Sequence, residues 1–117
     1  MPPKASRSRL VIVALGLTLA ACDPALVIRG NVRDAQHRPA ANAVVQLRCG
    51  TRVDARTSSD ADGGFRFHLL GWRPDTCVLE IARDRATPFA IWPIMPYCVK
   101  KHGDHACLEI AGVFQLP

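Results

Sequence analysis

Beyond its first 25 residues the sequence shows little helical periodicity, and its longest apolar run is too short to cross a bilayer. That run extends from Leu10 to Ala21, whereas a membrane-spanning helix needs about 20 apolar residues. The sequence also lacks a Gly-x-Ser-x-Gly nucleophile motif, an internal repeat and a second hydrophobic unit. These absences argue against a mainly helical fold, a membrane-spanning segment and an α/β-hydrolase. They leave one small β-rich domain in a chain of 117 residues.

The N-terminal segment has the three parts of an export signal. Cationic residues come first, the apolar run follows, and small residues precede a cysteine in Leu19-Ala20-Ala21-Cys22. This motif resembles the lipobox of bacterial lipoproteins. The resemblance implies cleavage before Cys22 and attachment of diacylglycerol to its thiol. The alternative is an ordinary secretory signal in which Cys22 is coincidental.

The lipobox divides the chain into three parts. Residues 1–21 are the signal peptide that is removed, residues 22–25 are the lipidated N-terminus with a short tether, and residues 26–117 are the folded domain. The expected location is the cell membrane, where the lipid anchors the chain and the domain faces the periplasm. Both the inner and the outer membrane are open at this point.

The charge balance of the domain is only mildly basic. The whole chain has 15 Lys and Arg against 10 Asp and Glu, a net charge of +5. The leader holds three of the cations and none of the acids, so its removal lowers the net charge to +2. The arginines of the domain alternate with apolar residues, which is typical of the solvated face of a sheet and not of a nucleic-acid footprint. We therefore expect no nucleic-acid partner. The seven of its ten arginines that follow this pattern are Arg29, Arg33, Arg48, Arg52, Arg56, Arg66 and Arg73.

Cysteine usage supports export. Of five cysteines, four are left once Cys22 is assigned to lipid. An even number in a small exported domain predicts two disulfides, because compartments outside the cytoplasm are oxidising. Four cysteines allow three pairings; nearness along the chain favours Cys98–Cys107 and leaves Cys49–Cys77. Loop-closure entropy makes the longer loop worth roughly 3–4 kcal/mol and the shorter one roughly 2.5–3 kcal/mol.

Apolar and polar residues alternate over several short segments separated by turn residues. Such alternation is typical of half-buried strands. The proline-rich segment 87–96 is expected to be an extended edge segment or a wrapping loop. About seven strands of this kind predict an all-β fold, a single antiparallel β-sandwich. The strand segments are 26–33, 43–49, 52–58, 65–69, 77–82 and 108–116.

The first half of the domain carries a more specific pattern. It contains Gly-x-Val-x-Asp over Gly30–Asp34, a proline turn at Pro39, and Ala43-Val44-Val45. A turn and hairpin then follow over Ser59–Phe67. In order and spacing these pieces resemble carboxypeptidase regulatory-like domains, over roughly residues 26–69. The resemblance implies a transthyretin-like (prealbumin-like) sandwich and a non-catalytic scaffolding or binding role. The chain departs from the pattern at Ser59, where the family commonly has Thr, and by one extra residue in the turn.

One cluster has metal-like spacing. Cys98, His102, His105 and Cys107 form Cys-x3-His-x2-His-x-Cys, and zinc prefers four nitrogen or sulfur ligands. The single residue between His105 and Cys107 makes the spacing tight for one ion. The alternatives are therefore a disulfide across a hairpin with solvated histidines, or a transition-metal site that uses His102 and His105.

These patterns favour a membrane-anchored, periplasm-facing lipoprotein that acts as a non-catalytic binding or scaffolding module. Its partners would be the membrane, through the N-terminal lipid, and an envelope protein. No cofactor and no catalytic residue are predicted. The alternatives are a metal-binding envelope protein and, with less support, a small hydrolase. Transthyretin-like hydrolases end in Tyr-Arg-Gly-Ser, whereas this chain ends in Phe-Gln-Leu-Pro.

Overall fold

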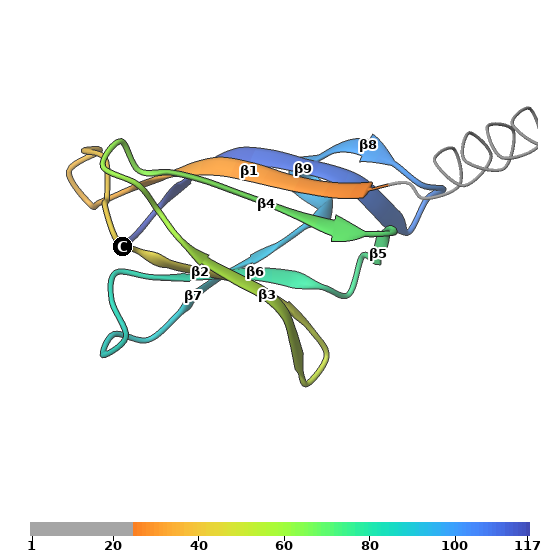
Figure 1. The fold of residues 1–117 in the computed structure, drawn as a ribbon, viewed down its shortest axis with the longest axis horizontal. Coiled ribbons are helices and arrows are strands. Elements are labelled where there is room, and N and C mark those ends of the chain that lie inside the picture. Colours follow the sequence, from red (N-terminus) through yellow and green to blue (C-terminus); the bar gives the residue numbers. More distant parts are fainter. Residues whose placement is uncertain (1–24) are drawn as a thin grey trace, which may run out of the picture.

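Two β-sheets face each other across an apolar core (Figure 1). The computed structural model describes residues 25–117. In the first sheet the order is β4-β1-β9-β5, with β8 paired to β9, and in the second it is β3-β2-β6-β7. The elements are β1 (Ala25–Arg33), β2 (Val44–Cys49), β3 (Arg52–Ser58), β4 (Gly64–Leu70), β5 (Arg73–Pro74), β6 (Val78–Ala82), β7 (Ala90–Pro93), the 3-10 helix η1 (Met95–Tyr97), β8 (Cys98–Lys101) and β9 (Ala106–Gln115).

The all-β sandwich predicted from the alternation is confirmed, with one correction to its antiparallel character. The first and last strands, β1 and β9, run parallel, in register from Val27 opposite Glu109 to Arg33 opposite Gln115. A parallel pair requires a long crossover connection. Here the connection contains the whole second sheet, since β2, β3, β6 and β7 lie between β1 and β9 in the sequence. Alternation within a strand shows which side chains share a face, but it does not show whether two distant strands run parallel or antiparallel. The described residues form nine strands, because the short β5 and β8 add to the segments that were predicted.

The core follows the predicted alternation. Side chains from both sheets pack against each other between them. Residues outside the strands, such as Ile94 and Leu116, complete this core. On β1 the residues at even positions, Leu26, Ile28 and Val32, are fully buried. Within residues 25–117 no helix is both long and apolar enough to cross a membrane. The buried apolar residues are Leu26, Ile28, Val32, Ala43, Val45, Leu47, Phe65, Cys77, Leu79, Ile81, Ala82, Ile94, Ala106, Cys107, Ile110, Phe114 and Leu116.

Two glycines allow β1 and β9 to lie under aromatic rings. Gly30 and Gly112 are opposite each other in the parallel pair. A Cβ on Gly30 would lie 2.6 Å from the carbonyl oxygen of Gly112 and 2.9 Å from the rings of Phe65 and Phe114. A Cβ on Gly112 would lie 2.7 Å from Tyr97. The rings therefore fill the space that side chains would take on other strands.

The proline-rich segment forms an edge strand. β7 pairs antiparallel with β6, from Val78 opposite Pro93 to Ile81 opposite Ala90. Trp92 contacts Phe114 edge-on, with ring centroids 5.5 Å apart, and the centroid of Tyr97 lies 4.8 Å from that of Phe114. Of the two predictions for residues 87–96, the extended edge segment is confirmed, because prolines are tolerated where a ladder has only one partner.

A polar row covers the second sheet on the side opposite the core. Gln46 is fully buried there, and its side-chain amide donates to the carboxylate of Glu80 at 2.7 Å. Arg48 donates to the same oxygen at 2.8 Å, and Arg56 donates to the Gln46 oxygen at 2.9 Å. Arg48 and Arg56 thus lie on the outer face, as the alternation predicted, but they shield the residues between them from water.

Candidate functional site

The predicted lipidation site lies outside the described residues. Leu19, Ala20, Ala21 and Cys22 all precede residue 25, where the description begins. The first described residue, Ala25, is also the first residue of β1. Any group attached at Cys22 is therefore three residues from the sandwich.

Both predicted disulfides are present. Cys49 at the end of β2 is bonded to Cys77, just before β6, and Cys98 at the start of β8 is bonded to Cys107 on β9. The first closes a sequence separation of 28 residues and the second a separation of 9. Nearness along the chain thus selected the correct pairing of the three that were possible.

The four-ligand metal alternative is wrong for the cysteines. The sulfurs of Cys98 and Cys107 bond to each other and cannot act as thiolates. His105 lies with Nδ1 3.0 Å from the carboxylate of Asp75. His102 stacks on the indole of Trp72, with centroids 5.4 Å apart and planes 13° apart. Over residues 25–117 no group of three or more His, Cys, Asp or Glu side chains is arranged to hold a metal ion.

Ser59, next to the predicted hairpin turn, has structural contacts. The Ser59 hydroxyl is buried; it donates to the carbonyl of Ala40 at 2.6 Å and accepts from the amide of Ala43 at 2.9 Å. Among the described residues no serine hydroxyl is hydrogen-bonded to a histidine. Asp60 caps the turn by accepting from the amides of Asp62 and Gly64 at 2.9 and 2.8 Å.

An open depression of about 650 Å³ lies over β1 and the neighbouring strand ends. Its polar lining includes Arg29, Arg66 and Thr57. The Arg29 guanidinium is paired with Glu109 at 2.6 Å. The depression therefore presents a mixed, partly neutralised surface with no concentrated charge.

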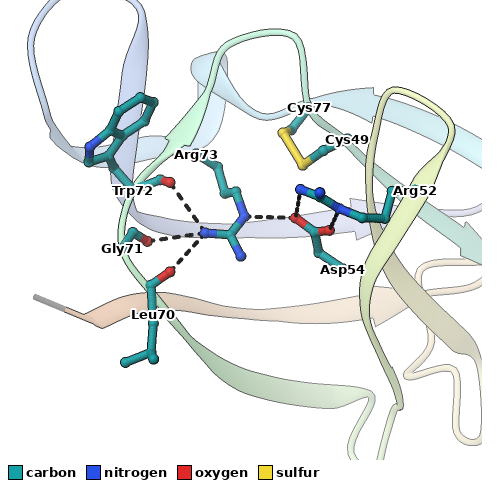
Figure 2. The surroundings of a disulfide bond; sticks show 8 residues. All are labelled: Cys49, Arg52, Asp54, Leu70, Gly71, Trp72, Arg73 and Cys77. Atoms are coloured by element: carbon teal, nitrogen blue, oxygen red, sulfur yellow. Dashed lines mark hydrogen bonds and ion pairs between the residues drawn. A yellow bond between two sulfur atoms is a disulfide. The ribbon is translucent and has the colours of Figure 1, made fainter. Parts of the chain in front are cut away.

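A carboxylate between two arginines ties the sheets together next to the Cys49–Cys77 disulfide (Figure 2). Asp54 on β3 accepts from Arg52 at 2.5 Å and from Arg73 on β5 at 2.8 Å. The Asp54 side chain is only 7% exposed and that of Arg73 18%. The alternation predicted Arg73 on a solvated sheet face, and this prediction is wrong. The loop before β5 turns the Arg73 side chain inward, toward Asp54.

The same guanidinium fixes the loop between β4 and β5. Arg73 Nη1 donates to the carbonyl of Leu70 at 2.9 Å and to that of Trp72 at 3.2 Å. Figure 2 shows the three loop carbonyls gathered around this one nitrogen. Since β3 belongs to the second sheet and β5 to the first, the Asp54–Arg73 pair joins the two sheets and holds the loop.

The arginines also set the titration of Asp54. Hydrogen bonding from Arg52, and then from Arg73, holds the pKa of Asp54 below its usual 3.8, although burial acts in the opposite direction. Asp54 in turn raises the pKa of Arg52. The ionised pair thus stabilises the fold above the pKa of the unfolded chain, and that stabilisation is lost as the pH falls through the lower pKa of the folded state.

We expect Asp54→Asn to lower the free energy of unfolding by about 2 kcal/mol at neutral pH, since it leaves two guanidinium groups without their carboxylate. The deficit should shrink as the pH falls below about 4, where the unfolded-state carboxylate of the wild type becomes protonated. Urea unfolding of the wild type and of Asp54→Asn between pH 7 and pH 2 measures this difference in the free energy of unfolding.

Asp62→Asn is the matched control, since Asp62 is exposed in a turn. It should change the free energy of unfolding by less than about 0.5 kcal/mol at every pH. A deficit for Asp54→Asn that is constant with pH would contradict the ion-pair explanation.

The end of the sandwich where β1 begins has an exposed apolar surface. We call it the Ala25 end: the loop 70–75 and the β8–β9 hairpin tip 102–105, beside Ala25 (at the right in Figure 1). Ala25 is opposite Leu70 in the β1–β4 ladder. The amide of Asp75 donates to the carbonyl of His105 at 2.7 Å, which joins the loop to the hairpin. Sequence reasoning did not place these residues together, because Leu70 follows Ala25 by 45 residues and His105 follows Asp75 by 30.

Comparisons with known proteins do not assign a family. No family model matches the chain, and no curated protein matches it. Among solved structures, the chain is similar to catechol 1,2-dioxygenase from Pseudomonas arvilla C-1, at 13% identity and a TM-score of 0.48. The match covers 82% of this chain and 53% of the dioxygenase chain, so this chain spans about half the length of that enzyme. At this level of similarity we transfer no activity.

Proposed function

We propose that the chain is a lipid-anchored envelope protein whose β-sandwich faces the periplasm as a non-catalytic binding or scaffolding module. The observation that carries the proposal is the motif Leu19-Ala20-Ala21-Cys22, placed three residues before the first strand. A lipid at Cys22 would hold the folded domain close to the bilayer, since the tether is short. Several acyl chains give a stable hold where a single chain gives a marginal one.

The cysteine pairing supports this proposal. The chain has five cysteines, and the four in residues 25–117 are bonded to one another. Cys22 therefore has no disulfide partner left within the chain, as expected of a cysteine that carries lipid. Two structural disulfides in so small a domain also favour an oxidising compartment outside the cytoplasm.

A binding or scaffolding role is the interpretation that fits the site best. The two-sheet fold agrees with the transthyretin-like architecture that the sequence pattern implies, and domains with that pattern usually serve as appended modules. The two histidines considered as metal ligands, His102 and His105, each have a contact within the fold. The proposal therefore gives the domain the task of presenting a surface to an envelope partner.

The experiment is expression of the full chain and of Cys22→Ser in a bacterium that processes lipoproteins. We expect the wild type in the membrane fraction, with acyl chains on an N-terminal Cys22 in mass spectra. Cys22→Ser should carry no acyl chains in mass spectra, and it should be missing from the lipidated protein of the membrane fraction. Separation of inner and outer membranes in the same experiment assigns the membrane.

The matched control is Thr18→Ser, which alters the apolar run but leaves residues 19–22 intact. It should behave as the wild type. An unmodified Cys22 thiol in wild-type protein that retains residues 1–21 and remains in the cytosol would refute the proposal.

A further inference from the structure

The Ala25 end exposes several large apolar side chains. Leu70 is 75% exposed and Trp72 47% exposed, and Val99 on β8, which pairs with β9, is 60% exposed. Figure 2 shows Leu70 beside the start of β1 and Trp72 farther along the loop, with the two side chains pointing to opposite sides of it. The loop is held by Arg73, so these side chains are displayed by a fixed backbone. Exposed apolar side chains at one end of a domain provide apolar groups that a docking surface can use.

Cationic residues flank this apolar surface. Lys100 and Lys101 are exposed at the end of β8, directly before the hairpin tip. The acidic groups nearby are mostly engaged: Asp75 with His105 at 3.0 Å and Glu109 with Arg29 at 2.6 Å. Asp104 is the acidic residue of the tip itself. Among the described residues neither lysine forms an ion pair with a carboxylate, so both ammonium groups are available to an anionic surface.

The tether brings this surface to the membrane. From Cys22 to Ala25 there are three residues, which span at most about 10 Å when fully extended. Leu70 is opposite Ala25 in the β1–β4 ladder. A lipid at Cys22 would therefore hold the Ala25 end within reach of the headgroups, while the opposite end, with the C-terminus, points away (Figure 1).

We propose that the Ala25 end docks on a bilayer with anionic headgroups, with the indole of Trp72 at the interface and Lys100 and Lys101 on the headgroup charges. Tryptophan is enriched at membrane interfaces because its ring is apolar and its N–H is polar. Basic residues near an anionic surface are attracted to it. This inference rests on the proposed lipid anchor and adds an orientation of the domain on the membrane. Loop 70–75 would contact the headgroups, and the sheets and the end with the C-terminus would be accessible to a partner.

The test uses the protein purified from bacteria that express the full chain. It is reconstituted in vesicles of phosphatidylethanolamine and phosphatidylglycerol whose acyl chains carry bromine, which quenches tryptophan emission. Trp92→Phe leaves Trp72 as the only tryptophan, and Trp72→Phe leaves Trp92, which packs on Phe114 inside the sandwich. We expect quenching and a shift to shorter wavelength for Trp72, and neither for Trp92. In the double variant Lys100→Gln/Lys101→Gln, the ratio of docked to undocked protein should fall about fivefold for each lysine removed.

The outcomes are separable. If the protein floats with the vesicles but Trp72 emits as it does in detergent, the anchor is intact and the docking is refuted. If the protein does not float and its mass lacks acyl chains, the anchor is refuted and the docking with it. Should Trp92→Phe fail to fold, the difference in quenching between the wild type and Trp72→Phe measures the same quantity.

Discussion

Replacing Cys49 and Cys77 together by alanine is expected to lower the free energy of unfolding by about 4 kcal/mol. The disulfide closes a separation of 28 residues, and chain entropy assigns about 3.6 kcal/mol to a loop of that length. Cys77 is fully buried, so the loss of its sulfur also leaves a small cavity. Urea unfolding of the oxidised proteins, monitored by circular dichroism, measures the difference.

The Cys98→Ala/Cys107→Ala variant is the matched control. Its loop separation is 9 residues, for which chain entropy gives about 2.7 kcal/mol. The order of the two losses is the test. A greater loss on removal of Cys98–Cys107 would mean that the β8–β9 hairpin, and not the connection between β2 and β6, limits unfolding.

Gly30→Ala is expected to lower the free energy of unfolding by about 3 kcal/mol. The new methyl would lie 2.6 Å from the carbonyl oxygen of Gly112, so the backbone of β1 or β9 must move. It would also meet the rings of Phe65 and Phe114 at 2.9 Å. Overpacking of a well-filled core typically costs about 1–3 kcal/mol, and a backbone obstacle places this substitution at the upper end. Thermal and urea unfolding measure the loss.

Gly50→Ala is the control for replacement of a glycine. No atom lies within 4 Å of a Cβ at this position, although its φ is +67°. The expected loss is about 1 kcal/mol, from the left-handed backbone alone. Equal losses at the two positions would show that the parallel pair of β1 and β9 can relax around a side chain.

Most strand positions were predictable because their determinants are local. Alternation fixes which side chains of a strand share a face, as in Leu26, Ile28 and Val32 on β1. The prediction weakened at β5, a strand of two residues within a loop containing Gly71 and Pro74. A two-residue ladder has no periodicity to detect, so only its partner β9 defines it.

The candidate site was predictable where covalent chemistry limits the choices. Four cysteines allow three pairings, and proximity along the chain selected the observed one. The contacts of Asp54 and Arg73 were not predictable, since they join strands of different sheets across a separation of 19 residues. The stacking of Trp72 on His102 depends in the same way on the β8–β9 hairpin folding back beside the loop.

The class of the fold, most strand segments and both disulfides were predictable from the order of residues within short stretches, and the export and lipid motif is proposed on the same basis. The parallel pairing of β1 with β9, the burial of Asp54 between two arginines and the exposure of Leu70 and Trp72 became evident only from the folded domain. Pairing and burial depend on which distant segments meet. That choice minimises the free energy of the whole sandwich, and no single segment encodes it.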